Sequence, residues 1–297
     1  MKNVLIAGGT GLVGKALQKL LRKEGYEVNL LSRKPSNPHQ GVFNWDPAKG
    51  TANEEPFRQA DFIVNLAGAN IGEKRLTEKR KAQVLNSRLD ATRLIGKMLE
   101  RDHHVKAVVQ ASAFGYYGDG KGNVLTEDAP PGNDYLADVC VQWEAAADDL
   151  IKLAPRVAVF RFAHVLSVDE GLLPRLMQPL KFGVMPVFGS GEQHIPWIHE
   201  EDLARMILFA LENENVNDTY NAVSPSRSTL NELLQATADA MKRKPIKFHL
   251  PETLIKLGVG ELGESFYYDV ALSSEKIERE GFEFIIPNDL RSAIASL

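Results

Sequence analysis

Short apolar runs alternate with stretches of helical periodicity along the first half of the chain. In those stretches apolar residues recur three and four positions apart, which predicts amphipathic helices. The first helix begins at Leu12 and ends at Gly25. The predicted strands cover residues 4–7, 28–31, 62–64, 105–111 and 157–160, and two further helices cover 85–99 and 138–153.

The predicted strands are apolar along most of their length instead of alternating with polar residues. Strands of this kind are buried on both faces, which is typical of a parallel sheet that helices cover on each side. Short right-handed crossovers between such strands give an α/β fold of the Rossmann type, with a doubly wound parallel sheet. We assign residues 1–165 to this cofactor-binding domain.

The pattern changes after about residue 165. Prolines interrupt a stretch rich in glycine, phenylalanine and methionine, and helical spacing returns at 203–211, at 230–241 and near 254–257. We expect residues 166–297 to form a smaller, partly interleaved substrate lobe. Within it, residues 171–197 are the candidate for facing a substrate. They line a pocket, act as a lid or form the buried seam between the two parts of the chain.

The composition is that of an ordinary globular protein and narrows the class of partner. The 297 residues are 44% hydrophobic and 25% charged, with a net charge of -4. That balance of charges favours neither a nucleic acid nor an anionic membrane as a binding partner. The single cysteine excludes an intramolecular disulfide. No signal-peptide pattern or membrane-spanning apolar run occurs, so we expect a cytoplasmic protein with a small-molecule substrate, and homodimer formation stays open.

Glycines at positions 8, 11 and 14 lie between the first strand and the first helix. In a dinucleotide site, the first glycine allows a tight turn and the second lets the backbone approach the pyrophosphate. The third lets helix and strand pack closely. The helix N-terminus then presents free N–H groups to the phosphates. We therefore predict a cofactor loop, with a ligand-free structural turn as the alternative. Its residues are Gly8, Thr10, Gly11, Leu12 and Val13.

The end of the second strand indicates which dinucleotide is bound. NAD sites usually carry a carboxylate about 20 residues after the glycine loop, where it holds the ribose 2′-hydroxyl. This strand instead ends in Ser32 and Arg33. A guanidinium suits the 2′-phosphate of NADP, so the sequence favours NADP over NAD, although a solvated basic turn has the same pattern. We also assign to the cofactor site Asp46, Leu66, Ala67 and Gly68.

Several motifs resemble the extended branch of the short-chain dehydrogenase/reductase superfamily. They are the glycine loop, NLAG at 65–68 and WIHEED at 197–202. The chain is more narrowly similar to an atypical group of epimerase family proteins, some described as nucleoside-diphosphate-sugar epimerases or cell-division inhibitors. That match rests on NSR at 86–88, SAFGYYG at 112–118, WEAA at 143–146, GSG at 189–191 and GFEF at 281–284. The resemblance spans the chain and implies a Rossmann-type NADP domain with a small C-terminal substrate lobe.

The superfamily's usual catalytic pair is absent from this chain. That pair is Tyr-x-x-x-Lys, in which the lysine lowers the pKa of the tyrosine, with an upstream Ser or Thr and an Asn. Counted from Glu144, the tyrosine position holds Leu136 and the lysine position holds Cys140. Arg88 occupies the Asn position, whereas the serine is kept as Ser112. The atypical group shows the same replacements, so they support the resemblance and remove the usual mechanism.

Four residues are candidates for catalysis. Ser112 would hold a substrate oxygen at the carboxyl end of a strand. Arg88 would stabilise an alkoxide or lower the pKa of Tyr117 or its neighbour Tyr116, unless it binds phosphate or caps the strand end. The tyrosines would otherwise pack as aromatic rings. Cys140 would act as a nucleophile or acid, or be a small buried apolar side chain.

The sequence thus predicts an NADP(H)-dependent oxidoreductase or epimerase-like enzyme that acts on a carbinol or carbonyl carbon of a small molecule or nucleotide sugar. A non-catalytic NADP-binding sensor or interaction protein is the alternative. His199 opens a helix and favours a structural role between lobe and sheet. His103 and His104 have no evident third ligand, so no metal site is expected.

Overall fold

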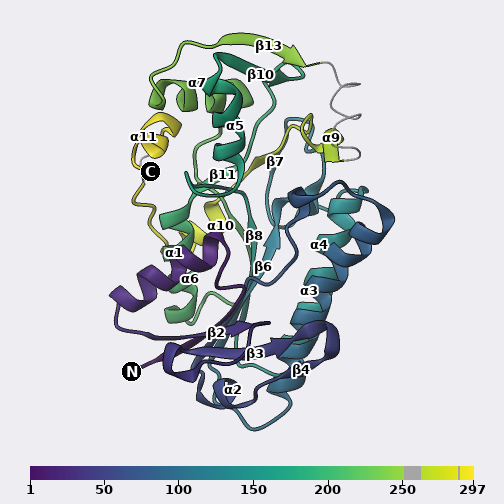
Figure 1. The fold of residues 1–297 in the computed structure, drawn as a ribbon, viewed down its shortest axis with the longest axis vertical. Coiled ribbons are helices and arrows are strands. Elements are labelled where there is room, and N and C mark those ends of the chain that lie inside the picture. The colour runs from purple at the N-terminus through teal and green to yellow at the C-terminus, as the bar shows by residue number, and fades with distance from the viewer. Residues whose placement is uncertain (251–261, 287) are drawn as a thin grey trace.

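The computed structural model describes residues 1–250, 262–286 and 288–297. Its centre is an eight-stranded sheet in the order β12-β8-β6-β5-β1-β2-β3-β4 (Figure 1). All neighbours are parallel except β4, which is antiparallel to β3. The strands are β1 (Asn3–Ala7), β2 (Glu27–Ser32), β3 (Val42–Asp46), β4 (Thr51–Ala52), β5 (Phe62–Asn65), β6 (Ala107–Ala113), β8 (Val157–Phe162) and β12 (Thr219–Ala222). This arrangement confirms the expected Rossmann-type α/β fold.

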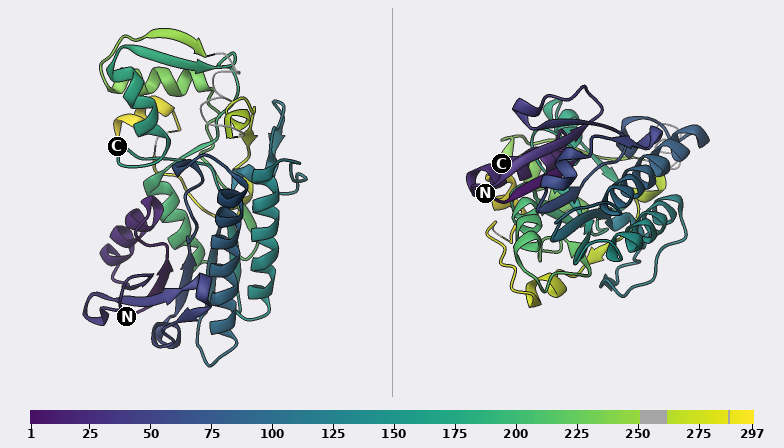
Figure 2. Two further views of the ribbon diagram at one scale, coloured as in Figure 1. Left: turned by 45° about the vertical axis from the view of Figure 1, so that its right-hand side comes forward. Right: turned by 90° about the horizontal axis from the view of Figure 1, so that it is seen from below.

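Helices cover both faces of the sheet. Helix α1 (Leu12–Lys23) packs beside α6 (Glu200–Glu212) on one face, and α3 (Glu78–Leu99) packs beside α4 (Tyr135–Ile151) on the other (Figures 1 and 2). Alternate residues of β1 enter the two cores: Val4 and Ile6 join the first, and Leu5 and Ala7 the second. The unbroken apolar run of this strand is therefore explained by burial on both sides.

Side chains at the helix N-termini fix where each helix begins. The Thr77 hydroxyl accepts a hydrogen bond from the backbone N–H of Arg80 at the start of α3, and Asp134 accepts one from Ala137 at the start of α4. Short helices α2 (Glu55–Gln59) and α10 (Glu275–Arg279) and the 3-10 turns η1 (Pro38–Gln40), η2 (Pro47–Lys49), η3 (Ile71–Glu73) and η4 (Phe114–Tyr117) complete the connections. Of these, η2, η3 and η4 follow the carboxyl ends of β3, β5 and β6.

A second body lies above the carboxyl edge of the sheet in the view of Figure 1. Its own core is built by α5 (Leu172–Lys181), β10 (Val184–Phe188), α7 (Leu230–Ala240) and α11 (Leu290–Ala295), and the mostly exposed strand β13 (Ile246–Leu250) pairs with β10. Strand pairs β9 (His164–Leu166) with β11 (Trp197–His199), and β7 (Val124–Leu125) with β14 (Ala271–Leu272), join it to the sheet, and α9 (Leu262–Ser265) lies beside it. This places the lobe over the edge at which Rossmann folds bind ligands.

The chain after residue 166 is divided between the two bodies. Strand β12 is part of the sheet and helix α6 packs in the core on one of its faces, whereas α5 and α7 pack in the core of the lobe. The helices predicted at 203–211 and 230–241 are confirmed as α6 and α7. The helix predicted near 254–257 lies outside the described residues, and the domain boundary at residue 165 stays a prediction.

Candidate functional site

A cavity of about 1120 Å³ opens at the carboxyl ends of β1, β2, β3 and β5. The chain leaves β1 on one side toward β2 and later returns on its other side as β5, so the cavity lies at the topological switch point of the sheet. Leu12 and Val13 begin α1 without lining it, but the other nine predicted cofactor residues do. These are Gly8, Thr10, Gly11, Ser32, Arg33, Asp46, Leu66, Ala67 and Gly68.

The three loop glycines have different reasons to lack a side chain. Gly8 has a φ of +79°, and a Cβ there would lie 2.7 Å from the Leu66 carbonyl. A Cβ at Gly14 would lie 2.6 Å from the Gly8 carbonyl oxygen. At Gly11 the nearest atom in the described part of the chain would be the Gly8 oxygen, at 3.6 Å. The fold itself therefore requires glycine at 8 and 14, whereas position 11 leaves room on its cavity side.

The first turn of α1 is equipped for an anion. Gly11 is the N-cap residue, no described side chain caps the helix, and its first turn contains no acidic residue. The first turn and the positive end of the helix dipole therefore have no negative side chain to compensate them, and Gly11 places this helix end at the cavity. A pyrophosphate fits this arrangement, because it accepts several backbone hydrogen bonds and carries negative charge.

The turn after β2 forms a basic rim on the same cavity. The backbone N–H of Lys34 donates to the Ser32 hydroxyl at 3.1 Å, and the side chain of Asn44 donates to the Lys34 carbonyl at 2.9 Å. Within the described ranges, no carboxylate forms an ion pair with Arg33 or Lys34. The nearby Asp46 pairs with Lys49 at 3.1 Å. The rim thus holds cations without an internal counter-charge, which suits a 2′-phosphate.

Ser112 and Tyr117 belong to one buried hydrogen-bond network. The Ser112 hydroxyl donates to a Glu144 carboxylate oxygen at 2.5 Å, and Arg161 donates to both oxygens of that carboxylate at 2.9 and 2.8 Å. Arg161 also donates to the Tyr117 hydroxyl at 2.9 Å, which donates to Asn221 at 2.7 Å. Burial raises the pKa of Tyr117 to about 12. Neither hydroxyl has a proton free for a substrate in this arrangement.

Arg88 and Cys140 are also engaged within the protein. The Arg88 guanidinium donates to the carbonyl oxygens of Ala69 and Val84 at 3.1 and 2.9 Å and lies 4.9 Å from the centre of the Trp143 ring. Burial lowers the pKa of Arg88. The thiol of buried Cys140 faces the Ala113 carbonyl at 3.6 Å, and burial raises its pKa to about 12. Such a thiol stays protonated, which disfavours nucleophilic chemistry.

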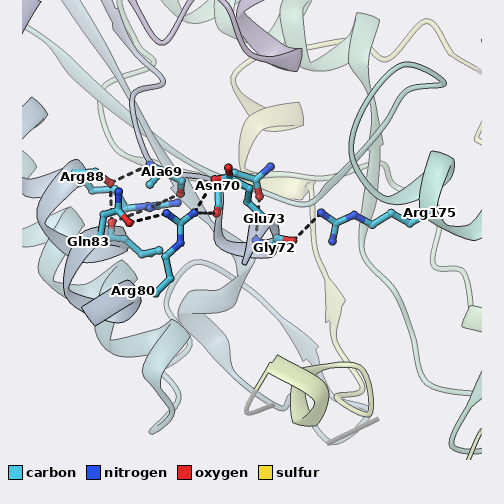
Figure 3. Close-up of polar contacts among 10 residues, drawn as sticks. Ala69, Asn70, Gly72, Glu73, Arg80, Gln83, Arg88 and Arg175 are labelled. Atoms are coloured by element: carbon cyan, nitrogen blue, oxygen red, sulfur yellow. Dashed lines mark hydrogen bonds and ion pairs between the residues drawn. The ribbon is translucent and has the colours of Figure 1, made fainter. Parts of the chain in front are cut away.

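Arg80 is a cavity residue that sequence reasoning missed (Figure 3). It is 7% exposed, and its guanidinium donates to the Asn70 carbonyl at 2.6 Å, to Glu73 at 3.0 Å and to Gln83 at 2.7 Å. From the C-terminal lobe, Arg175 donates to the Gly72 carbonyl at 2.9 Å. Two arginines from different bodies therefore hold turn η3 at the cavity wall. Glu144 and Arg161 were missed too, since their roles depend on tertiary contacts.

His199 has a structural position. It is 4% exposed, its Nδ1 accepts the backbone N–H of Glu201 at the start of α6, and its Nε2 lies 3.5 Å from the Ser296 hydroxyl. No three His, Cys, Asp or Glu side chains among the residues that could be described are arranged to hold a metal ion. Over the same residues, no helix combines the length and apolar character needed to cross a membrane.

Comparison with known proteins identifies similar chains over the full length. The NAD dependent epimerase/dehydratase family profile matches residues 4–222. Epimerase family protein SDR39U1 of Mus musculus is 33% identical over 296 residues, covering 98% of each chain. Epimerase family protein YfhF of Bacillus subtilis is 30% identical over 299 residues, covering 99% of this chain and 97% of its own.

Solved structures agree with this relationship. The crystal structure of human epimerase family protein SDR39U1 with NADPH superposes with a TM-score of 0.87 at 31% identity, covering 99% of this chain and 98% of that one. A Thermus thermophilus UDP-glucose 4-epimerase in complex with NAD gives a TM-score of 0.76 at 17% identity, covering 98% of this chain and 97% of that one. The second likeness supports the fold alone.

Proposed function

The chain belongs to the NAD dependent epimerase/dehydratase family, and from that premise we propose that it is an NADP(H)-dependent oxidoreductase or epimerase-like enzyme. Its substrate would carry a carbinol or carbonyl carbon and be a small molecule or a nucleotide sugar. The observation that carries the cofactor choice is the basic rim of Ser32, Arg33 and Lys34 on the cavity. The NADPH bound to the human relative supports the same choice.

Each part of the cavity has a separate task in this proposal. The first turn of α1 binds the pyrophosphate, and Gly11 lets it approach the backbone. Arg33 and Ser32 bind the 2′-phosphate, and Asp46 and the Leu66-Ala67-Gly68 strand end complete the wall. When bound, the cofactor supplies the hydride chemistry. The protein's own contribution is to hold that group at the carboxyl edge of the sheet, beneath the C-terminal lobe.

A non-catalytic NADP(H)-binding protein is the second candidate, and one observation favours it. All four predicted catalytic side chains are bound to protein groups, and the only hydroxyl proton of Ser112 is donated to Glu144. NADPH consumption over a panel of carbonyl compounds and nucleotide sugars separates the candidates. Turnover of any of these compounds by the purified protein supports the proposal of an enzyme, whereas binding of NADPH without turnover favours the non-catalytic NADP(H)-binding protein.

Exchange of Arg33 for aspartate tests the cofactor choice. Arg33→Asp removes a charge-assisted hydrogen bond and repels the 2′-phosphate, so NADPH should bind about 10- to 150-fold more weakly. Arg22→Asp makes the same exchange on an exposed arginine of α1 that does not line the cavity, and it should bind NADPH normally. Calorimetric titration with NADPH and NADH measures both variants. A wild-type protein that binds NADH as tightly as NADPH would contradict the proposal.

A further inference from the structure

His164 lies at the same edge of the sheet as the candidate catalytic residues. It opens β9, one residue beyond the end of β8, and β8 pairs with β6 so that Ala113 lies opposite Phe162. The residue after β6 is Phe114, whose ring centre lies 4.7 Å from that of His164 at an interplanar angle of 59°. The imidazole is therefore packed beside the strand end that carries Ser112.

The start of α1 lies near the same strand on another side. A Cβ built on Gly171 would lie 3.3 Å from the Val165 carbonyl oxygen and 3.4 Å from a methyl group of Leu12. Val165 follows His164 in β9, and Leu12 follows the cavity residue Gly11. Strand β9 is thus bracketed by the helix end that faces the pyrophosphate and by the carboxyl end of β6.

The imidazole of His164 is not committed to the protein. Its backbone N–H donates to the Pro196 carbonyl at 3.0 Å and fixes the strand, but neither ring nitrogen has a hydrogen bond to any described residue. Burial lowers its pKa to about 4, so the ring is neutral at neutral pH. A neutral imidazole has one N–H donor and one acceptor nitrogen. The hydroxyl protons of Ser112 and Tyr117, by contrast, are donated to Glu144 and Asn221.

We propose that His164 donates a hydrogen bond to a carbonyl oxygen at the reacting end of the cofactor site. The oxygen belongs to the nicotinamide carboxamide or to the substrate carbonyl that accepts hydride. A neutral imidazole can polarise a carbonyl without carrying a charge of its own. The adjacent Phe114 ring gives the oxygen an apolar surrounding, which strengthens such a bond. This inference rests on the proposed NADP(H) function.

The first experiment asks whether the oxygen belongs to the cofactor. His164→Leu removes the donor at similar volume, and His164→Gln keeps an N–H donor. Calorimetry compares NADPH with 2′-phospho-ADP-ribose, which has no nicotinamide. A carboxamide contact predicts that His164→Leu weakens NADPH at least about fivefold, that 2′-phospho-ADP-ribose binds as before, and that His164→Gln recovers part of the loss. His104→Leu, at an exposed histidine, is the matched control.

The second experiment asks whether the oxygen belongs to the substrate. NADPH oxidation is followed with phenanthrenequinone, benzil and pyruvaldehyde. A substrate contact predicts that His164→Leu lowers kcat by about a hundredfold at unchanged NADPH affinity, and that His164→Gln restores part of it. Equal NADPH affinity and equal turnover in wild type and His164→Leu would overturn the proposal. The proposal would also be overturned if the wild type reduced none of the three compounds and if wild type and His164→Leu bound NADPH equally tightly.

Failure of the underlying function gives a different result. A wild-type protein that binds neither NADPH nor 2′-phospho-ADP-ribose refutes the cofactor site, and with it the role of His164. Binding of both compounds by the wild type, with no effect of either His164 substitution in either experiment, refutes the role of His164 alone. Circular dichroism of the variants checks that each is folded before either conclusion is drawn.

Discussion

The glycines of the cofactor loop contact one another within one turn, whereas Ser112 is held by a residue far along the chain. The spacing of Gly8, Gly11 and Gly14 reflects contacts within one turn, so the pattern locates the loop. The partner of Ser112 is Glu144, which comes 32 residues later in the chain. No spacing rule connects two such positions, because the contact exists only once α4 has packed on β6.

Alanine at two of the loop glycines should separate binding from folding. In Gly11→Ala the nearest atom of the described residues to the new methyl is the Gly8 oxygen at 3.6 Å, so the protein should fold normally. NADPH affinity should nevertheless fall at least about a hundredfold, because the methyl group blocks the approach of the pyrophosphate to the backbone. In Gly14→Ala the methyl would lie 2.6 Å from backbone, so the free energy of unfolding should fall by about 1–3 kcal/mol. Urea unfolding and NADPH titration measure both. Tight NADPH binding by folded Gly11→Ala would argue against a phosphate loop.

The thiol of Cys140 should be unreactive at neutral pH. Its pKa is raised from 9.0 to about 12, so the thiolate is disfavoured in the folded protein over the whole range between those values. Alkylation of the native protein by iodoacetamide at pH 8 should therefore be at least about a hundredfold slower than alkylation of the urea-unfolded chain. The rate for the native protein should keep rising at pH values where the rate for the unfolded chain has already levelled off. Mass spectrometry reads a single site, since the chain has one cysteine. Fast alkylation of the native protein at pH 7 would restore Cys140 as a nucleophile.

At the scale of elements, apolar periodicity found the buried faces of the helices but not their polar beginnings. The pattern predicted a helix over 85–99, whereas α3 begins at Glu78. Its first turn consists of charged residues, and the residue buried there is Arg80, which a hydrophobicity pattern assigns to solvent. Strand β3 alternates buried and partly exposed residues because it lies toward the edge of the sheet, and it was not predicted as a strand although Asp46 at its end was assigned to the site.

Removal of Arg80 should loosen turn η3 as a unit. Arg80→Met removes the short guanidinium hydrogen bond to the Asn70 carbonyl, which keeps only the longer one from the Glu73 N–H among the described residues, and the ion pair with Glu73. The free energy of unfolding should therefore fall by about 2 kcal/mol or more, and NADPH should bind at least about fivefold more weakly. Arg175→Met removes one bond from an exposed side chain to Gly72 and should cost less than about 1 kcal/mol. Urea unfolding and calorimetric titration give both values. Equal effects of the two substitutions would mean that the turn does not depend on the buried arginine.

For the whole molecule, the alternation of strands and helices was sufficient to predict the Rossmann-type sheet but not its last strand. β12 is four residues long and follows the first part of the C-terminal lobe along the chain, so nothing in its sequence shows that it rejoins the sheet beside β8. Its Asn221 accepts the hydroxyl proton of Tyr117, which contacts Arg161 on β8. The polar network thus extends from the sheet edge to α4. It joins segments that the sequence separates widely.

The Glu144–Arg161 pair should therefore couple these segments energetically. Their side chains are 15% and 5% exposed, and removal of one partner leaves a buried charge unpaired. Glu144→Gln and Arg161→Met should each lower the free energy of unfolding by about 3–5 kcal/mol. The double variant should lose less than the sum, by about 1–3 kcal/mol, because neither charge is then stranded. As a control, Lys152→Met breaks a pair with Asp149 that is about three-quarters exposed on both sides, and it should change stability by less than about 1 kcal/mol. Urea unfolding of the wild type, the two single variants and the double variant gives the double-mutant cycle, and Lys152→Met is measured in the same way as the control. Additive losses would show that the two side chains act independently and that the network does not bind α4 to the sheet as one unit.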